Sequence, residues 1–115
     1  MHPNLKTCNV AIYARCAVDT TGSAAIKDQV QRCLAFVERA GGDGSRTTVF
    51  ADSGISGRRA QRPSYASLMA AVEDGRINAV VTQDLSRVTR DIAEASRIRV
   101  QLERAGVSLL TLPDC

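Results

Sequence analysis

The stretch AIYARCAVD, residues 11–19, decides the fold, because it starts as an apolar strand and then turns abruptly polar at an arginine. We predict a strand over Asn9–Arg15, on the β-branched and aromatic residues Val10, Ile12 and Tyr13. Arginine offers a planar fork that grips phosphate or carboxylate in two places. The stretch therefore raises the question of what the Arg15 guanidinium holds at the tip of a strand.

Outward from this strand, the apolar pattern alternates between strands and helices. Further strands are predicted over Thr47–Asp52, Ala79–Leu85 and Val107–Leu112. A Thr/Gly/Ser break is expected at Thr20–Ser23, before a first helix that ends at Gly41-Gly42. Its apolar face is formed by Ile26, Val30, Cys33, Leu34 and Val37.

Two more helices follow, each with a recognisable stop. One starts at Pro63, has an apolar face of Tyr65, Leu68, Met69 and Val72, and ends at Gly75. The other runs from about Asp91 to Ala105, stops at Gly106 and points Ile92, Ala95, Ile98 and Leu102 inward.

This alternation predicts an α/β fold: a three-layer parallel sheet of about four strands, with helices on both faces and room for a short edge strand. Ligands of such sheets sit beyond the carboxyl ends of the strands. Three loops would bring arginines to that one edge. They are Arg15 at the end of the first strand, Arg58, Arg59 and Arg62 after the second, and Arg87 and Arg90 after the third.

Composition excludes several classes of protein. The 115 residues suit one domain, 1–115, with 44% hydrophobic and 23% charged residues. We expect no membrane span and no secretory signal, and therefore a cytoplasmic protein. Four cysteines without a CxxC pair and a single histidine argue against a zinc site or another metal, and no cofactor is expected. Thirteen arginines stand against two lysines, a bias that a GC-rich genome also explains.

Converging guanidiniums make an anion site, and phosphate is the commonest anion that needs one. The nearby carboxylates, Asp52, Asp84 and Asp91, show no paired-carboxylate metal signature. Phosphoryl chemistry would then rely on arginines and hydrogen-bond donors. A strand-end serine would be the natural nucleophile, since His2 is isolated. The alternative is that each arginine is only a surface residue or one partner of an ion pair that stabilises the fold.

Four motifs in this order resemble the catalytic domain of serine site-specific recombinases, the resolvases, invertases and serine integrases. The motifs are YARCA in the first strand, IKDQVQRC, FADSGISGRRAQRP and SRVTRD, and the resemblance covers about residues 9–112. LERAGVSLLTL is similar to the family's usual helix end and final strand. The gap between Ala17 and Gln29 and the Arg62-Pro63 pair look more like the large serine integrase or transposon subgroup.

The resemblance implies a DNA recombinase that cleaves and rejoins DNA through a covalent 5′-phosphoserine link, without a metal. Its site residues here would be Arg15, Gln29, Asp52, Ser56, Arg62, Arg87 and Arg90, with Tyr13, Ser86 and Asp91 in support. The arginines would stabilise the transition state, Arg62 and Ser56 would orient the phosphate, and Asp52 and Gln29 would hold the loop and its neighbours.

Two positions depart from the family pattern. Ala17 stands where the family has its nucleophilic serine, so catalysis is expected to be lost. Three explanations stay open: deliberate substitution that traps an inactive form, a naturally degenerate recombinase, or transfer of the role to Cys16, which alternation would point to the opposite face. Ser86 replaces the aspartate of many relatives, which keeps a hydrogen-bonding group and loses a charge.

The expected partners are double-stranded DNA and further copies of the protein, as a dimer and a synaptic tetramer. The long dimerisation helix and the DNA-binding region of the family are not in this sequence, so we expect a truncated or excised catalytic domain. At a net charge of +3, its own DNA affinity should be weak and steeply salt-dependent.

The alternative function is a non-catalytic DNA-associated or regulatory domain that keeps the arginine rim. Ala17 favours it, and the joint presence of the arginines argues against it. A phosphate-accepting receiver domain is excluded, because it needs acidic residues where this chain has Arg15.

Overall fold

Strands and helices alternate along the chain as the sequence predicts. The computed structural model describes residues 9–16, 19–53, 63–84, 88–89 and 91–112. Four strands lie within them: β1 (Val10–Cys16), β2 (Thr47–Ser53), β3 (Ala79–Thr82) and β4 (Ser108–Thr111). They are connected by the helices α1 (Asp19–Arg39), α2 (Pro63–Glu73) and α3 (Ile92–Arg104), and a short 3₁₀ helix, η2 (Gly44–Arg46), precedes β2.

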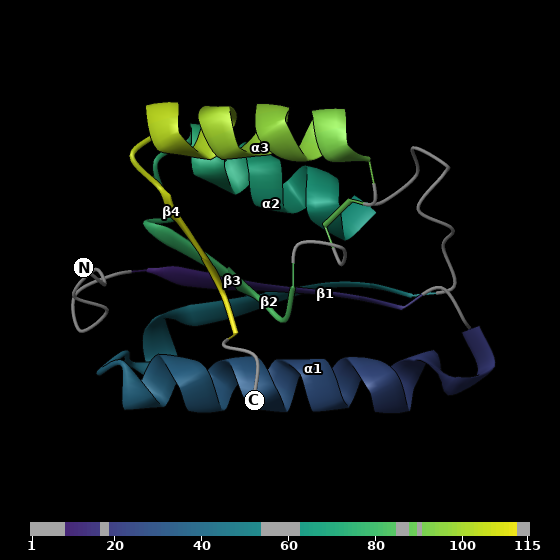
Figure 1. Cartoon of the computed structure of the whole chain (residues 1–115). Coiled ribbons are helices and arrows are strands. Elements are labelled where there is room, and N and C mark those ends of the chain that lie inside the picture. The colour runs from purple at the N-terminus through teal and green to yellow at the C-terminus, as the bar shows by residue number, and fades with distance from the viewer. Residues whose placement is uncertain (1–8, 17–18, 54–62, 85–87, 90, 113–115) are drawn as a thin grey trace.

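The strands form one parallel sheet in the order β2-β1-β3-β4, which confirms the predicted parallel sheet and places β1 inside it. The chain moves from β1 to β2 in one direction and then returns past β1 to β3 and β4. Right-handed crossovers that reverse direction in this way place their helices on opposite faces. Accordingly, α1 covers one face while α2 and α3 cover the other (Figure 1).

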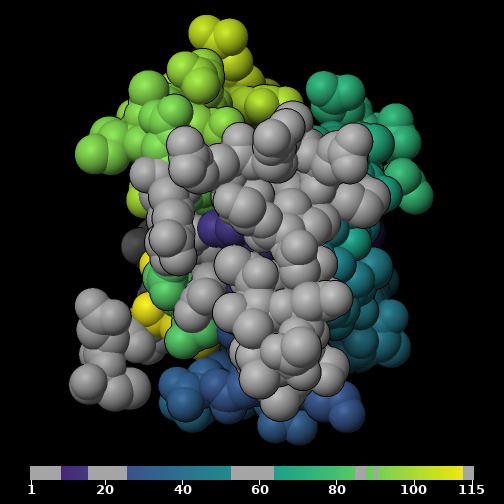
Figure 2. Space-filling view, turned by 90° about the vertical axis from the view of Figure 1, so that its right-hand side faces the viewer, coloured from purple at the N-terminus to yellow at the C-terminus, as the bar shows by residue number. Residues whose placement is uncertain are grey.

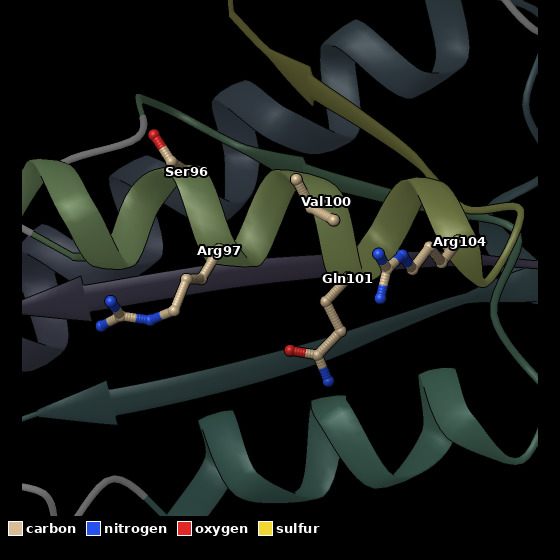
Figure 3. A pocket seen from close by; sticks show the side chains of 5 residues that line it. All are labelled: Ser96, Arg97, Val100, Gln101 and Arg104. Carbon is tan, nitrogen blue, oxygen red and sulfur yellow. The ribbon is translucent and has the colours of Figure 1, made fainter.

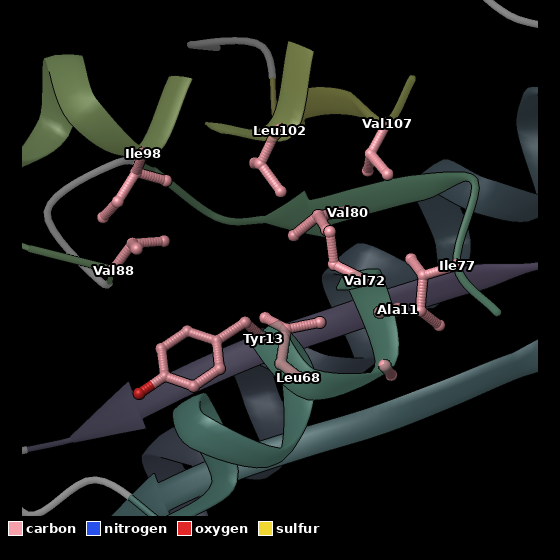
Figure 4. Close-up of a cluster of buried hydrophobic side chains, with 11 residues drawn as sticks. Ala11, Tyr13, Leu68, Val72, Ile77, Val80, Val88, Ile98, Leu102 and Val107 are labelled. Atoms are coloured by element: carbon pink, nitrogen blue, oxygen red, sulfur yellow. The ribbon is translucent and has the colours of Figure 1, made fainter. Parts of the chain in front are cut away.

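Two apolar layers hold the helices to the sheet, because successive strand residues face opposite sides. The layer under α2 and α3 contains Ala11, Tyr13, Leu68, Val72, Val80, Ile98 and Leu102 (Figure 4). The layer over α1 contains Val10, Ile12, Cys33, Val37, Ala79 and Val81. The helical apolar faces predicted from the sequence therefore meet the sheet at most positions.

The three α-helices end in the same way, at the glycines that the sequence marked as stops. Gly41, Gly75 and Gly106 have φ values of 88°, 75° and 75°, which residues with a Cβ rarely adopt. In each case the next amide donates back five residues: Gly42 N to Val37 O, Arg76 N to Ala71 O and Val107 N to Leu102 O. Pro63 opens α2, as expected of a residue without an N–H.

The expected break at Thr20–Ser23 is wrong, because these residues belong to the first turns of α1. Once a helix is anchored, each added residue closes another backbone hydrogen bond, so the helix continues through weak helix formers. Even Gly22 costs only about 1 kcal/mol relative to alanine. The face that includes Cys33 and Val37 provides that anchor against the sheet.

Two further details differ from the prediction. The third strand ends at Thr82 instead of Leu85, where the Thr82 hydroxyl donates to the Tyr13 carbonyl at 2.9 Å; Leu85 itself lies outside the described residues. Ile92, expected inward, is 85% exposed. A helix as long as α3 spans about 20 Å, whereas the four residues of β3 span about 13 Å. One end of α3 must therefore overhang, and that end carries Ile92.

Candidate functional site

The carboxyl edge of the sheet is where the sequence places its candidate site. Figure 2 looks at this edge and shows α1 below, α2 and α3 above, and a part of β1 in purple between them. The strand order changes direction between β1 and β3, since β2 follows β1 on one side and β3 lies on the other. Ligands of open parallel sheets bind at such a switch point, beyond the strand ends.

Strand β1 reaches further toward this edge than its neighbour at the switch point. Tyr13 pairs with Thr82, the last residue of β3, so β1 continues past β3. On its other side β1 stays paired with β2, with Arg15 opposite Asp52 and Cys16 opposite Ser53. Within the described residues, β3 therefore does not extend beside Arg15.

The side chain of Gln29 fills this gap. Its Oε1 accepts a hydrogen bond from the Arg15 N–H at 3.2 Å, and its Nε2 donates to the Arg15 carbonyl at 3.0 Å. Gln29 is 3% exposed and Arg15 is 5% exposed, so both bonds lie in the interior. An amide that donates and accepts at one residue reproduces what a neighbouring strand would supply.

Helix α1 holds Gln29 in place through its apolar face. Gln29, Cys33 and Val37 recur every four residues, which puts them on one side of the helix. Cys33 and Val37 are fully buried against β1 and β3. The packing of these two side chains therefore fixes the depth at which the Gln29 amide meets the strand.

Asp52, at the end of β2, is the second predicted site residue with a defined role. Its carboxylate accepts from the Tyr13 hydroxyl at 2.8 Å and from the backbone N–H groups of Ser64 and Tyr65 at 3.0 Å each. The two amides belong to the first turn of α2, whose N–H groups lack helical partners. Asp52 therefore caps α2 from a distant part of the chain, and it is 3% exposed.

Tyr13, predicted as a supporting residue, links this cap to the core. Its ring is fully buried and meets the Tyr65 ring edge to face, with centroids 5.8 Å apart. Its carbonyl accepts from Thr82 and its hydroxyl donates to Asp52. One residue thus ties β1, β2, β3 and the start of α2 together.

Arg15 lies two residues beyond Tyr13 and therefore on the same face of the sheet, under α2 and α3. A buried guanidinium is stable only with hydrogen-bonding partners. Its backbone is held by Gln29, and its strand neighbour is Asp52. The described residues thus place a cation at the carboxyl edge on a rigid frame.

Asp91, predicted as a supporting residue, caps α3. Its carboxylate accepts from the N–H groups of Ala93 at 2.9 Å and Glu94 at 3.3 Å, and its own N–H donates to the Thr89 hydroxyl. An N-cap carboxylate satisfies amides that the helix leaves unpaired. The structure therefore gives Asp91 a local role in α3.

Several predicted site residues lie outside the described residues, and the expectations for them stay predictions. They are Ala17, Ser56, Arg58, Arg59, Arg62, Ser86, Arg87 and Arg90. The structure brings together Tyr13, Arg15, Gln29 and Asp52 from the remaining set.

The sequence did not predict the roles of two further residues at the same edge. Ser64 donates from its hydroxyl to the Ala51 carbonyl at 2.7 Å, and Thr82 donates to Tyr13. The signals were present but weak: a serine directly after a helix-opening proline, and a threonine closing an apolar strand.

Among the described residues no group of His, Cys, Asp or Glu is arranged to hold a metal ion. None of the described helices is long and apolar enough to cross a membrane.

A separate hollow of about 450 Å³ lies on the outer surface of α3. It is lined by Ser96, Arg97, Val100, Gln101 and Arg104, and Figure 3 shows Arg97 and Gln101 leaving the helix on the same side. All five residues come from one helix, so this hollow is a surface feature apart from the polar network of Tyr13, Arg15, Gln29 and Asp52.

Comparisons with known proteins agree with this architecture. A family model described as "Resolvase, N terminal domain" matches residues 10–114. No curated protein matches the sequence. Among solved structures, the catalytic domain of ISC1926 TnpA, an IS607-like serine recombinase, is similar with a TM-score of 0.80 and 21% identity, over 92% of this chain and 70% of that one.

Two further structures are similar at the same identity, 21%. The N-terminal catalytic domain of TP901-1 integrase has a TM-score of 0.78 over 90% of this chain and 76% of that one. A resolvase family site-specific recombinase from Streptococcus pneumoniae has a TM-score of 0.75 over 89% and 70%. At this identity the likeness shows a shared fold.

Proposed function

The chain belongs to the family of resolvase N-terminal domains, the catalytic domains of serine recombinases, and from this premise we propose that it is the part of a site-specific DNA recombinase that binds the scissile phosphate. The observation that carries the proposal is the buried Arg15 at the switch point of the sheet, with its backbone held on both polar groups by Gln29. A fixed cation at that place suits an anionic phosphodiester.

The reaction implied by the family needs no group beyond the protein and DNA. A serine oxygen bonds to the scissile phosphorus and the bond to the 3′-oxygen breaks. The serine gives up its proton and the 3′-oxygen gains one, which leaves a 5′-phosphoserine link and a free 3′-hydroxyl. Reversal with a new 3′-hydroxyl rejoins the strands.

The proposed division of roles follows the contacts where they are described. Arg15, with Arg87 and Arg90, stabilises the charge on the phosphorane-like transition state. Arg62 and Ser56 orient the phosphate. Asp52 supports the frame by capping α2, and Tyr13 supports Asp52.

The residue at the nucleophile position makes this chain inactive in our proposal. Ala17 has no atom that can attack phosphorus, so the chain binds DNA but neither cuts it nor forms an adduct. We further propose that residues 1–115 act as a catalytic domain within a recombinase that assembles as a dimer and a synaptic tetramer on DNA.

The test restores a nucleophilic hydroxyl at position 17. The unaltered chain, Ala17→Ser and Ala17→Ser with Arg15→Ala, each in a full-length context that supplies the family's dimerisation and DNA-binding regions, are incubated with a library of random double-stranded oligonucleotides. Detergent-stable adducts are then trapped and sequenced. We expect adducts from Ala17→Ser alone, with a free 3′-hydroxyl that a terminal transferase can label. The added Arg15→Ala should slow adduct formation roughly 10²–10³-fold, the usual loss for one such contact, about 3–4 kcal/mol.

Each other outcome has a defined meaning. An adduct formed by the unaltered chain and mapped to Cys16 would overturn the assignment of the nucleophile position. Binding of DNA by all three proteins without any adduct would support the second candidate function, a non-catalytic DNA-associated or regulatory domain, which Ala17 favours. A circular dichroism spectrum of each variant shows whether the fold survives the change.

A further inference from the structure

The backbone at the tip of β1 is held by side chains where strand β3 has ended. The Thr82 hydroxyl donates to the Tyr13 carbonyl at 2.9 Å, and the Gln29 amide bonds both polar groups of Arg15 at 3.2 and 3.0 Å. Tyr13, Arg15, Gln29 and Thr82 are all buried. Buried backbone groups nearly always have hydrogen-bond partners. The side chains of Thr82 and Gln29 supply such partners to β1 at the point where β3 ends.

The early end of β3 matters because it opens the switch point. If β3 ran on beside Arg15, its backbone would occupy the place where ligands of such sheets bind. If nothing replaced it, the Arg15 N–H and carbonyl would be buried without partners, at a cost of about 1–3 kcal/mol for each group. A single amide on α1 satisfies both groups and approaches from the face opposite to α2 and α3.

We propose that Gln29 and Thr82 are positioning residues that hold the Arg15 peptide extended, so that its guanidinium is set before DNA arrives. This inference rests on the proposed function, since it concerns how the phosphate-binding arginine is placed. Gln29 therefore acts on the reaction through the backbone of Arg15 and makes no contact with DNA. Thr82 acts two residues before Arg15 along β1, by donating to the carbonyl of Tyr13.

Geometry supports action through the backbone. Both polar atoms of the Gln29 amide are engaged by Arg15 main-chain atoms, and Gln29 is 3% exposed. A residue placed in this way transmits the position of α1 to Arg15, because its neighbours on the helix face, Cys33 and Val37, are buried against the sheet.

The first test measures how well the Arg15 amide is protected from exchange, and it requires no recombinase activity. Amide hydrogen exchange of Arg15 is followed by NMR in the unaltered chain, Gln29→Met, Gln29→Glu and Thr82→Val. Gln31→Met and Gln31→Glu serve as matched controls, because Gln31 lies on the same helix and is exposed. We expect exchange at Arg15 to accelerate at least tenfold in Gln29→Met and to stay within about twofold in both controls.

Gln29→Glu keeps the proposal testable if the methionine variant unfolds. A carboxylate can accept from the Arg15 N–H, but it leaves the buried Arg15 carbonyl without a donor and repels its oxygen, which should loosen the whole peptide and expose its N–H to exchange; a protonated carboxyl can make both bonds. Protection of the Arg15 amide should therefore recover as the pH falls toward the glutamic acid pKa, about 4.3 or higher when buried. The unaltered chain and Gln31→Glu, measured over the same pH range, show whether other groups contribute.

The second test reads the reaction in the Ala17→Ser background. We expect Gln29→Met to slow adduct formation roughly 10–100-fold while DNA affinity stays within about twofold, because a misplaced group costs rate more than binding. Unchanged Arg15 exchange in Gln29→Met, or an equal loss of rate and affinity, would overturn the positioning role. If Ala17→Ser gives no adduct at all, the proposed function fails, while the exchange measurements still test on their own whether Gln29 holds the Arg15 peptide.

Discussion

At the scale of single residues, buried polar side chains replace backbone partners at the ends of β1 and β2. Asp52 is the clearest case, because one carboxylate serves the Tyr13 hydroxyl and two amides of the first turn of α2. Hydrogen bonds to a charged group are worth more than neutral ones, and a donor left without its acceptor in the interior carries the full cost of desolvation. The stability of this corner therefore depends on the identity of one side chain.

We expect Asp52→Asn to lower the free energy of unfolding by about 1.5–3 kcal/mol. The amide keeps the shape but turns an N–H₂ group toward donors, so at least one of the three bonds is lost. Urea denaturation followed by circular dichroism measures the change. The control is Asp28→Asn, where the carboxylate forms an exposed i,i+4 pair with Arg32 at 3.0 Å and should matter by less than about 0.5 kcal/mol. Equal effects of the two changes would contradict the role of Asp52.

Cys33 gives a residue-scale prediction that depends on pH. Burial raises the pKa of its thiol from 9.0 to about 11, because the thiolate is disfavoured away from water. Its stabilising contribution is complete below pH 9 and is lost as the pH rises from about 9 to about 11. We expect Cys33 to react with iodoacetamide at pH 8 only as fast as the protein unfolds, measured by mass spectrometry of the peptide that contains it. Rapid labelling of Cys33 in the folded protein would contradict its burial.

At the scale of elements, α3 has three distinct parts: an N-cap, a first turn that extends beyond the strands, and a face that packs on the sheet. Asp91 satisfies two amides at its start, and Ile98 and Leu102 anchor it in the core. Ile92, one residue after the cap, is exposed because the helix is longer than the strand beneath it. The amino-terminal turn of α3 is therefore held by its cap instead of by apolar packing.

We expect Asp91→Ala to cost about 1 kcal/mol of stability and Asp91→Asn to cost much less, since asparagine is also a good cap. Thermal unfolding of both variants measures the difference. If Asp91 mainly served a phosphate site, both substitutions would change DNA affinity to the same extent, and both would leave the free energy of unfolding almost unchanged. That pattern would contradict the capping role.

The two apolar ends of α3 should respond very differently to truncation. Leu102→Ala leaves a cavity in the core and should lower the free energy of unfolding by about 2–5 kcal/mol. Ile92→Ala removes a side chain that is 85% exposed and should change it by less than about 0.5 kcal/mol. Chemical denaturation of the two variants side by side is sufficient. A large loss from Ile92→Ala would mean that another surface covers this turn.

At the scale of the whole molecule, the proposed DNA contact lies at one edge of the sheet, while arginines also occupy other surfaces. The α3 hollow carries Arg97 and Arg104, away from the network around Arg15. With a net charge of +3, long-range attraction contributes little, so specific phosphate contacts should dominate. Salt dependence can separate the two sets of arginines, because each neutralised phosphate adds to the slope.

We expect the DNA affinity to fall steeply between 50 and 200 mM salt, with a log–log slope that becomes shallower by about 1 in Arg87→Gln. Arg104→Gln, a matched change of charge on the outer face of α3, should leave the slope unchanged. Fluorescence anisotropy with a labelled duplex measures both. A slope that responds to Arg104 and ignores Arg87 would place the DNA on α3 instead.

Much of the fold followed from local patterns in the sequence. Apolar periodicity placed all four strands and three helices, and Pro63, Gly75 and Gly106 marked helix ends, because backbone geometry at such positions depends on the residue itself. The order of elements then implied a parallel sheet, and the motif order identified the family. These are properties of neighbours along the chain, which is why the sequence alone determined them.

Only the tertiary structure decided which distant groups meet. Gln29 finds the Arg15 backbone because β3 stops at Thr82, and Asp52 finds the amides of α2 because β2 ends beneath that helix. Ile92 is exposed although its periodicity points inward, since periodicity describes a helix face and contains no information about the length of the strand below it. Sequence determined the elements and their polar ends through local conformational preference, and packing decided their partners through the lengths and registers at which the elements come together.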